Sequence, residues 1–145
     1  MKILSWFIVF LGVCGLIGVR VLEDRIFYDP FLDYFHAGVK NIAFPEFDWA
    51  KLILSHVFRF SLNLIFSCIV VHFIFKRKEW TLQAAVLITL AFCITLPIYL
   101  YCIYNEFEIG YLFSFYIRRF VIQPILLLLI IPLFYYRKNV ELKSQ

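Results

Sequence analysis

The sequence lacks the patterns of several common kinds of site. It contains no Cys-x-x-Cys pair, and its four cysteines lie inside long apolar runs rather than in loops: Cys14, Cys68, Cys93 and Cys102. We interpret them as free thiols that fill helix contacts, not as disulfides or a redox motif. No histidines and carboxylates occur at metal-ligand spacing. We therefore expect no metal ion and no cofactor.

Charge is also scarce. Charged residues make up 17% of the 145-residue chain and hydrophobic residues 63%, whereas soluble domains have about 25% and slightly under half. The net charge is +4, but the cations gather near the ends of apolar runs instead of forming a stripe, which argues against nucleic acid as a partner. With a mean hydropathy of +0.86, the chain is predicted to be an integral membrane protein that contacts the lipid bilayer.

Four apolar runs define the predicted fold. They cover residues 3–19, 52–75, 82–104 and 111–136, and each is close to the 17–25 residues that cross a hydrocarbon core of about 30 Å. We expect an all-α integral membrane protein, a four-transmembrane-helix bundle that forms one domain over residues 1–145. No small-x-small cleavage site follows the first run, so we expect it to remain in place. Pro97, Pro124 and Pro132 should bend the third and fourth helices.

The distribution of cations predicts the orientation. The connection between the second and third runs and the tail 137–145 are basic, whereas the turn 105–110 carries two glutamates and no cation. The basic residues are Lys76, Arg77, Lys78, Arg137, Lys138 and Lys143. Because short cytoplasmic segments are enriched in Lys and Arg, both termini should be cytoplasmic and the loop 20–51 should face outward.

That outward loop is predicted to contain a short interfacial helix. Asp29 suits a helix N-cap and Pro30 the first helical position. The helix should place an aromatic side in the outer interface of the membrane. This side consists of Phe27, Phe31, Tyr34 and Phe35. Asp48 should then cap the second transmembrane helix.

Three arginines interrupt the apolar runs. Arg59 lies in the second run, and Arg118 and Arg119 lie in the fourth. A charge inside a bilayer costs a few kcal/mol or more, so a partner or water must compensate it. Each arginine lies about seven residues inside its run, which corresponds to roughly 10 Å of depth. The three guanidinium groups should therefore share one layer beneath the outer surface.

Other polar residues should join this layer. His56, Arg59 and Asn63 have the spacing of one helix face, as do Arg119 and Gln123, and both faces should look into the bundle. Glu23, Asp24 and Arg25 follow the first helix at the same outer end. One interpretation is a structural ion-pair network that fastens the first loop to the bundle. Another is an anion site for a lipid headgroup, a glycan phosphate or a peptide carboxylate.

A third interpretation is an intramembrane cysteine enzyme. Cys102 could approach His56 and either Arg118 or Arg119, which would activate its thiol. We favour a buried structural thiol, because nothing in the local sequence marks a nucleophile. A proton-coupled transporter is disfavoured, since no carboxylate lies in the middle of a run.

Two segments carry a resemblance to a family. Residues 20–30, Arg-Val-Leu-Glu-Asp-Arg-Ile-Phe-Tyr-Asp-Pro, and residues 115–124, Phe-Tyr-Ile-Arg-Arg-Phe-Val-Ile-Gln-Pro, resemble the exosortase F system-associated membrane proteins. The chain is similar to them almost end to end. The resemblance implies a bacterial inner membrane and a link to an exosortase-type membrane protein, a cysteine transpeptidase that processes C-terminal sorting signals. Exosortase motifs are absent here, so it implies a non-enzymatic accessory that scaffolds or presents a partner or substrate.

Overall fold

The structure is a computed structural model that describes residues 2–37 and 43–144. Its helices are α1 (Lys2–Val21), α2 (Glu23–Ile26), α3 (Phe31–His36), α4 (Trp49–Phe75), α5 (Lys78–Tyr104), α6 (Tyr111–Ile122) and α7 (Ile125–Lys143). The described residues contain no strand, so the predicted all-α class is confirmed. Residues 38–42 of the predicted loop and the last residue of the predicted tail lie outside the described residues.

The long helices are those of a membrane protein. Helices α1, α4 and α5 are each long and apolar enough to cross a bilayer. Helices α6 and α7 are long and apolar enough only when they are taken together, and this pair is bent by 63° at a short break. The described residues thus provide three candidate spans, or four if the bent pair is one span.

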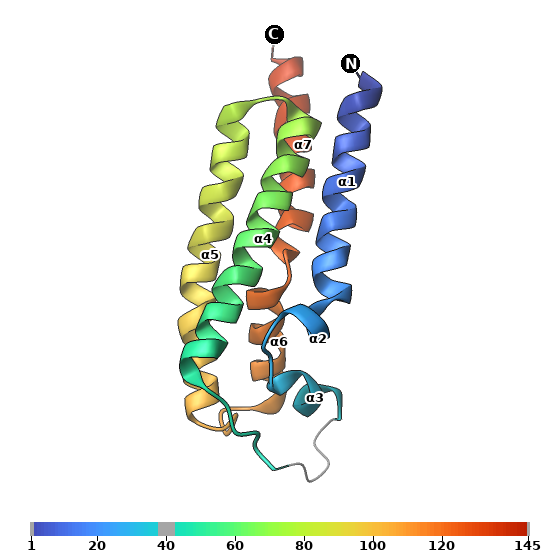
Figure 1. The fold of residues 1–145 in the computed structure, drawn as a ribbon. Coiled ribbons are helices and arrows are strands. Elements are labelled where there is room, and N and C mark those ends of the chain that lie inside the picture. The colour runs from blue at the N-terminus through green and yellow to red at the C-terminus, as the bar shows by residue number, and fades with distance from the viewer. Residues whose placement is uncertain (1, 38–42, 145) are drawn as a thin grey trace.

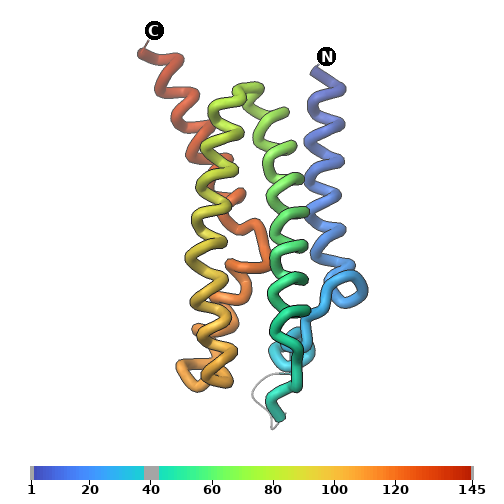
Figure 2. Tube along the Cα trace, turned by 60° about the vertical axis from the view of Figure 1, so that its left-hand side comes forward, coloured from blue at the N-terminus to red at the C-terminus, as the bar shows by residue number. Residues whose placement is uncertain are grey.

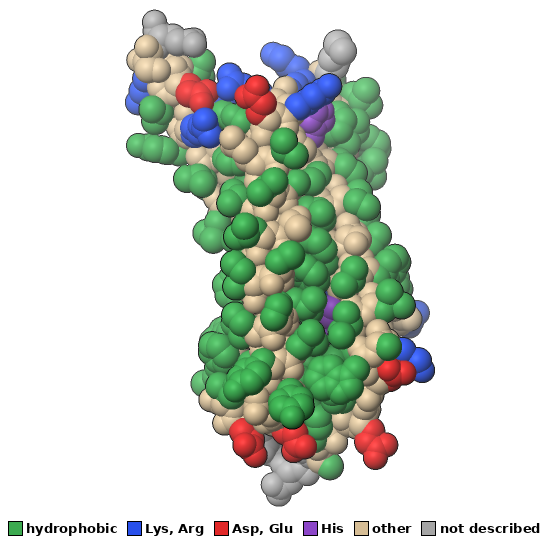
Figure 3. Space-filling view, turned by 90° about the vertical axis from the view of Figure 1, so that its left-hand side faces the viewer, with side chains coloured by type: hydrophobic (Ala, Val, Ile, Leu, Met, Phe, Trp, Pro, Cys, Tyr) green, Lys and Arg blue, Asp and Glu red, His purple; other side chains and the backbone are tan. Residues whose placement is uncertain are grey.

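The helices form an elongated bundle with two distinct ends. Figures 1 and 2 show that α1 begins and α7 ends at the same end, which we call the terminal end. Helices α2 and α3 and the turn 105–110 lie at the other end, the cap end (Figure 1). On the face shown in Figure 3, hydrophobic side chains cover the length of the bundle and most Lys and Arg side chains gather at the terminal end.

Helix ends follow local signals in the sequence. Asp48 Oδ1 accepts a hydrogen bond from Ala50 N at 2.9 Å, so the predicted cap of α4 is confirmed. At the other end of α4, Lys76 adopts a left-handed conformation (φ 54°) and its N–H donates to His72 O. Helices α5 and α7 extend past the predicted apolar runs, because hydropathy marks only the lipid-facing part of a helix. The predicted tail is helical as far as Lys143.

A break at Gln123 and Pro124 separates α6 from α7. Pro124 has no N–H to donate to a preceding carbonyl, and Ile125 N donates to Gln123 O at 2.8 Å instead of continuing the helix. The freed carbonyl of Ile122 accepts a hydrogen bond from Asn63 Nδ2 at 3.1 Å, contributed by α4. By contrast, Pro97 and Pro132 lie inside helices that continue through them.

Two apolar clusters fill the bundle, one toward each end. The cap cluster is built from the buried residues Phe31, Phe35, Leu52, Tyr99, Cys102, Ile103, Phe107, Val121 and Ile122. The terminal cluster is built from Val71, Phe75, Trp80, Ala84, Ile88, Leu127, Ile130 and Phe134. Helix α1 packs mainly on α4, where Gly12 and Gly15 permit close approach to Val70 and Phe66.

The aromatic side of α3 faces protein, which differs from the predicted position in the membrane interface. Phe31 and Phe35 are buried, and both rings contact Phe107 at centroid distances of 5.4 and 5.0 Å. Phe107 reaches them from the turn 105–110, where it adopts a positive φ of 61°. A positive φ is unfavourable for a bulky residue, so the packing of its ring offsets backbone strain.

Candidate functional site: a buried ion-pair cluster

Four charged residues form a cluster where α4 and α6 meet the segment between α1 and α3. We call Glu23, Asp29, Arg59 and Arg118 the ion-pair cluster. Arg59 Nη2 donates to Glu23 Oε2, and Arg118 Nη2 donates to Asp29 Oδ2 at 2.5 Å. Asp29 Oδ2 also lies 4.0 Å from Arg59 Nη1, so one carboxylate oxygen interacts with both arginines. The cluster therefore joins three separate parts of the chain.

Asp29 also determines the local structure of the segment that carries it. Its second oxygen, Oδ1, accepts a hydrogen bond from Phe31 N at 3.3 Å at the start of α3. Pro30 has helical dihedral angles, as expected beside a capping residue. The side chain predicted as a helix cap therefore has a second role, because its other oxygen is free to accept from Arg118.

The cluster is buried and formally neutral. The side chains of Arg59, Asp29 and Arg118 are 3%, 4% and 7% exposed, and that of Glu23 is 16% exposed. Two guanidinium groups and two carboxylates cancel in charge, which reduces the cost of removing them from water. Arg59 also lies over the ring of Phe27 and Arg118 over that of Phe35, with Cζ 5.3 and 5.5 Å from the ring centroids.

Further polar side chains surround these ion pairs. His56 donates from Nδ1 to Leu52 O at 2.8 Å, and its ring centroid lies 5.4 Å from that of Tyr99. Several buried polar atoms near the ion pairs have no hydrogen-bond partner among the described residues: His56 Nε2, Arg59 Nε, Ser114 Oγ and Arg118 Nε. The neutral cluster thus retains hydrogen-bonding capacity.

The structure brings together only some of the residues predicted to share the outer layer. Glu23, Arg59 and Arg118 meet in the cluster, and His56 and Asn63 lie buried on either side of Arg59 along α4. Asp24, Arg25 and Arg119 are exposed and make no ion pair with a described residue. Gln123 is half-buried at the end of α6, outside the cluster.

The outcome for Arg119 corrects the predicted face of the fourth helix. Arg119 does not look into the bundle; it is exposed and lies over the ring of Phe115, with Cζ 5.7 Å from the centroid. The inward face of α6 instead carries Ser114, Arg118 and Val121, which are all buried and have helical spacing. Spacing to Gln123 was misleading, because α6 ends before that residue.

The geometry around Cys102 bears on the cysteine-enzyme interpretation. Cys102 is completely buried in the cap cluster among aromatic and aliphatic side chains. A nucleophilic thiol needs access to substrate and an electropositive, partly exposed setting. In this structure the thiol has the surroundings of a small packing residue.

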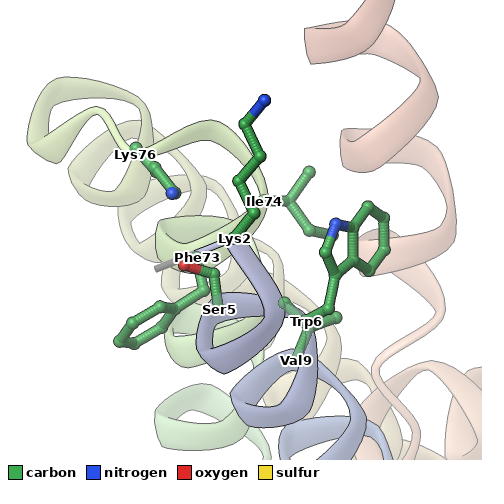
Figure 4. A pocket seen from close by; sticks show the side chains of 7 residues that line it. All are labelled: Lys2, Ser5, Trp6, Val9, Phe73, Ile74 and Lys76. Atoms are coloured by element: carbon green, nitrogen blue, oxygen red, sulfur yellow. The ribbon is translucent and has the colours of Figure 1, made fainter.

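A small cavity lies at the terminal end of the bundle. It has a volume of about 90 Å³, and Ser5 and two lysines, Lys2 and Lys76, are among the residues that line it. Figure 4 shows the Lys2 side chain extending past the end of α1, away from Ser5 and Val9, so the two cations do not converge on one point. No group of three or more His, Cys, Asp or Glu side chains with metal-binding geometry occurs in residues 2–37 and 43–144.

Comparison with known proteins gives no further constraint on this site. No family model, no curated protein and no solved structure matches the chain.

Proposed function

We propose that this chain is a non-enzymatic accessory protein of a bacterial inner membrane that scaffolds or presents a partner on its outer side. The observation that carries the proposal is the neutral ion-pair cluster, in which Asp29 and Glu23 fasten the first loop to Arg118 and Arg59. Rigid surfaces of this kind suit recognition, because less conformational entropy is lost on binding.

The surface presented would be the cap end. Two further contacts hold the loop there: Tyr111 Oη donates to Phe35 O at 3.0 Å, and Asp48 N donates to Tyr28 Oη at 3.3 Å. Exposed aromatic and aliphatic side chains lie nearby on α5 and α6, including Tyr104, Leu112 and Tyr116. Exposed apolar groups at a membrane surface are suited to contact with another membrane protein.

The proposed topology has four crossings, with α6 and α7 forming the fourth and both termini cytoplasmic. The exposed cations Lys76, Arg77 and Lys138 lie on the terminal side of the bundle, as the enrichment of Lys and Arg in cytoplasmic segments requires. Single-cysteine labelling of intact cells tests the proposed topology. Positions in the turn 105–110 should react with an impermeant reagent and position 143 should not; the opposite pattern would reverse the orientation.

The proposed partner is an exosortase-type transpeptidase, on the basis of the family resemblance alone. Affinity purification in mild detergent should recover such a membrane protein together with this chain. If other partners are recovered and no exosortase-type protein is among them, the proposed association with an exosortase is wrong. The proposed scaffold role would still stand.

The cysteine-enzyme alternative makes a different prediction. Cys102→Ser should leave protein sorting intact if the thiol only packs, whereas an enzyme would lose activity. Because serine places a hydroxyl in an apolar site, Cys102→Ala is the matched variant that avoids an unpaired polar group. Loss of sorting in both variants at normal protein abundance would favour the enzyme.

A further inference from the structure

A lateral groove separates α1 from the α6–α7 pair. It has a volume of about 310 Å³, and residues of α1, α4, α6 and α7 line it. Helix α1 packs against α4 and makes few contacts with α6 or α7, so the groove opens between them. Along α1 it extends from Val13 to Arg20, about 10 Å at the rise of an α-helix.

The groove has an apolar body and polar groups toward the cap end. Its apolar walls include Val13, Leu16 and Leu128. Arg20 lines the end nearest the cap and makes no ion pair with any residue in 2–37 or 43–144. In the same chain, Arg59 and Arg118 are neutralised by carboxylates. Arg20 is thus a cation at the edge of an apolar groove.

Two amides also line the groove. Asn63 is 5% exposed, and its Oδ1 has no hydrogen-bond partner among the described residues while its Nδ2 donates to Ile122 O. Gln123 and Pro124, which form the break between α6 and α7, belong to the same wall; Figure 2 shows the chain leaving its helical path there. Irregular backbone at membrane depth is tolerated where it is buried or lines a cavity that supplies polar partners.

We propose that this groove binds one phospholipid with an anionic headgroup. The phosphate pairs with Arg20, polar groups of the headgroup region approach the Asn63 and Gln123 amides, and an acyl chain lies along the apolar walls toward the terminal end. Basic pockets between transmembrane helices recognise anionic headgroups in this way.

The mix of groups in the groove favours a lipid over an apolar helix of another protein. The volume of about 310 Å³ is at the lower end of the range for small-molecule sites. A phospholipid supplies both an anionic group for Arg20 and an acyl chain for the apolar walls, whereas an apolar helix face leaves Arg20 without an anion.

Native mass spectrometry of the detergent-purified chain tests this inference with phosphatidylglycerol and phosphatidylcholine of identical acyl chains. One phosphatidylglycerol molecule should bind in preference to phosphatidylcholine. Arg20→Gln should weaken phosphatidylglycerol binding by about tenfold, the effect of losing a charge-assisted hydrogen bond. It should weaken phosphatidylcholine binding less, because the choline ammonium already compensates the charge of that phosphate. Arg25→Gln is the matched control, because Arg25 is exposed nearby but does not line the groove.

A second variant tests the groove itself. Val13→Trp places a larger side chain at an exposed groove-lining position, so it should reduce binding of both lipids without unfolding the protein. Equal binding of the two lipids by the unmodified chain would overturn the proposal, as would unchanged phosphatidylglycerol binding in Arg20→Gln. Displacement of a copurifying protein by Val13→Trp, with no effect on lipid, would also overturn it in favour of a partner helix.

Discussion

The two ends of the bundle hold their charges in different ways. At the cap end, Arg118 and Asp29 are 7% and 4% exposed and lie between helices. At the terminal end, Arg77 and Glu141 form an ion pair at 3.0 Å, but their side chains are 54% and 38% exposed. Arg137 pairs with the same glutamate at 3.2 Å from one turn away. The same chemistry therefore occurs once inside the protein and once in contact with solvent.

This difference predicts different energetic consequences. Removing one partner of a buried pair leaves a charge without compensation, whereas exposed pairs contribute about 0–1 kcal/mol. The buried pairs also join segments far apart in sequence, since 89 residues separate Asp29 from Arg118. Charge at the cap end therefore fixes tertiary structure, whereas charge at the terminal end contributes little to it.

The largest effect is expected from Arg118→Ala. This change leaves Asp29 buried without its closest cation, and we expect a loss of about 3–5 kcal/mol in the free energy of unfolding. Arg118→Lys should recover part of the loss, because an ammonium group cannot reproduce the planar guanidinium. Thermal unfolding in detergent and protein abundance in the membrane measure the effect.

A double variant provides the control for this prediction. Arg118→Met combined with Asp29→Asn leaves Arg59 paired with Glu23, keeps an oxygen to cap α3 and strands no charge. Its stability should be closer to that of the unmodified protein than to that of Arg118→Ala. A stable Arg118→Ala protein that has lost function would instead favour the anion-site interpretation, because removing a cation from such a site relieves repulsion.

An intermediate effect is expected in the middle of the bundle, where the packing of α1 against α4 depends on the shapes of side chains rather than on charge. A side chain added at Gly15 would approach Phe66 Cε1 to 2.5 Å, so Gly15→Val should cost about 1–3 kcal/mol through overpacking. Thermal unfolding measures this cost. Gly18→Ala is the matched control, because a Cβ there meets no atom within 4 Å and should be neutral or slightly stabilising. Equal destabilisation by both variants would contradict close packing of α1 on α4.

Much of the architecture could be predicted from hydropathy. The four apolar runs coincide with α1, α4, α5 and the α6–α7 pair, because a bilayer imposes length and polarity on every crossing segment. The break after Ile122 could not be read from Pro124 alone, since α5 and α7 continue through their own prolines. What distinguishes this proline is Asn63, which reaches from α4 to the freed carbonyl.

The candidate site was predictable in composition but not in detail. The cost of charge in an apolar run identified Arg59 and Arg118 as residues that need partners, and Glu23 was among the expected carboxylates. Asp29 was missed as a partner because capping accounted for it, although a carboxylate has two oxygens and capping uses one. Helical spacing could not decide between adjacent arginines, since that depends on how α6 is rotated against α4.

A comparison of the two adjacent arginines tests this rotation. The expected loss of stability is smaller than for the variants above. Arg119 differs from Arg118 by one position, yet it is exposed and lies over the Phe115 ring. Arg119→Ala should cost about 0.5–1 kcal/mol, the range of an exposed cation–π contact. Thermal unfolding of both alanine variants under the same conditions makes the comparison. Equal losses would mean that both arginines are buried and that α6 is rotated relative to this structure.

The smallest effect is expected from Arg77→Ala at the terminal end. The change removes an exposed ion pair with Glu141 and the contact of Arg77 with Trp80, at 5.0 Å from Cζ to a ring centroid. Arg137 continues to pair with Glu141 and to lie over the same tryptophan, so neither group is left without a partner. We expect a loss of about 0–1 kcal/mol, measured by thermal unfolding, and a smaller one at high salt because exposed charges are screened. A salt-independent loss as large as that of Arg118→Ala would show that the terminal end also depends on buried charge, and the contrast between the two ends would no longer hold.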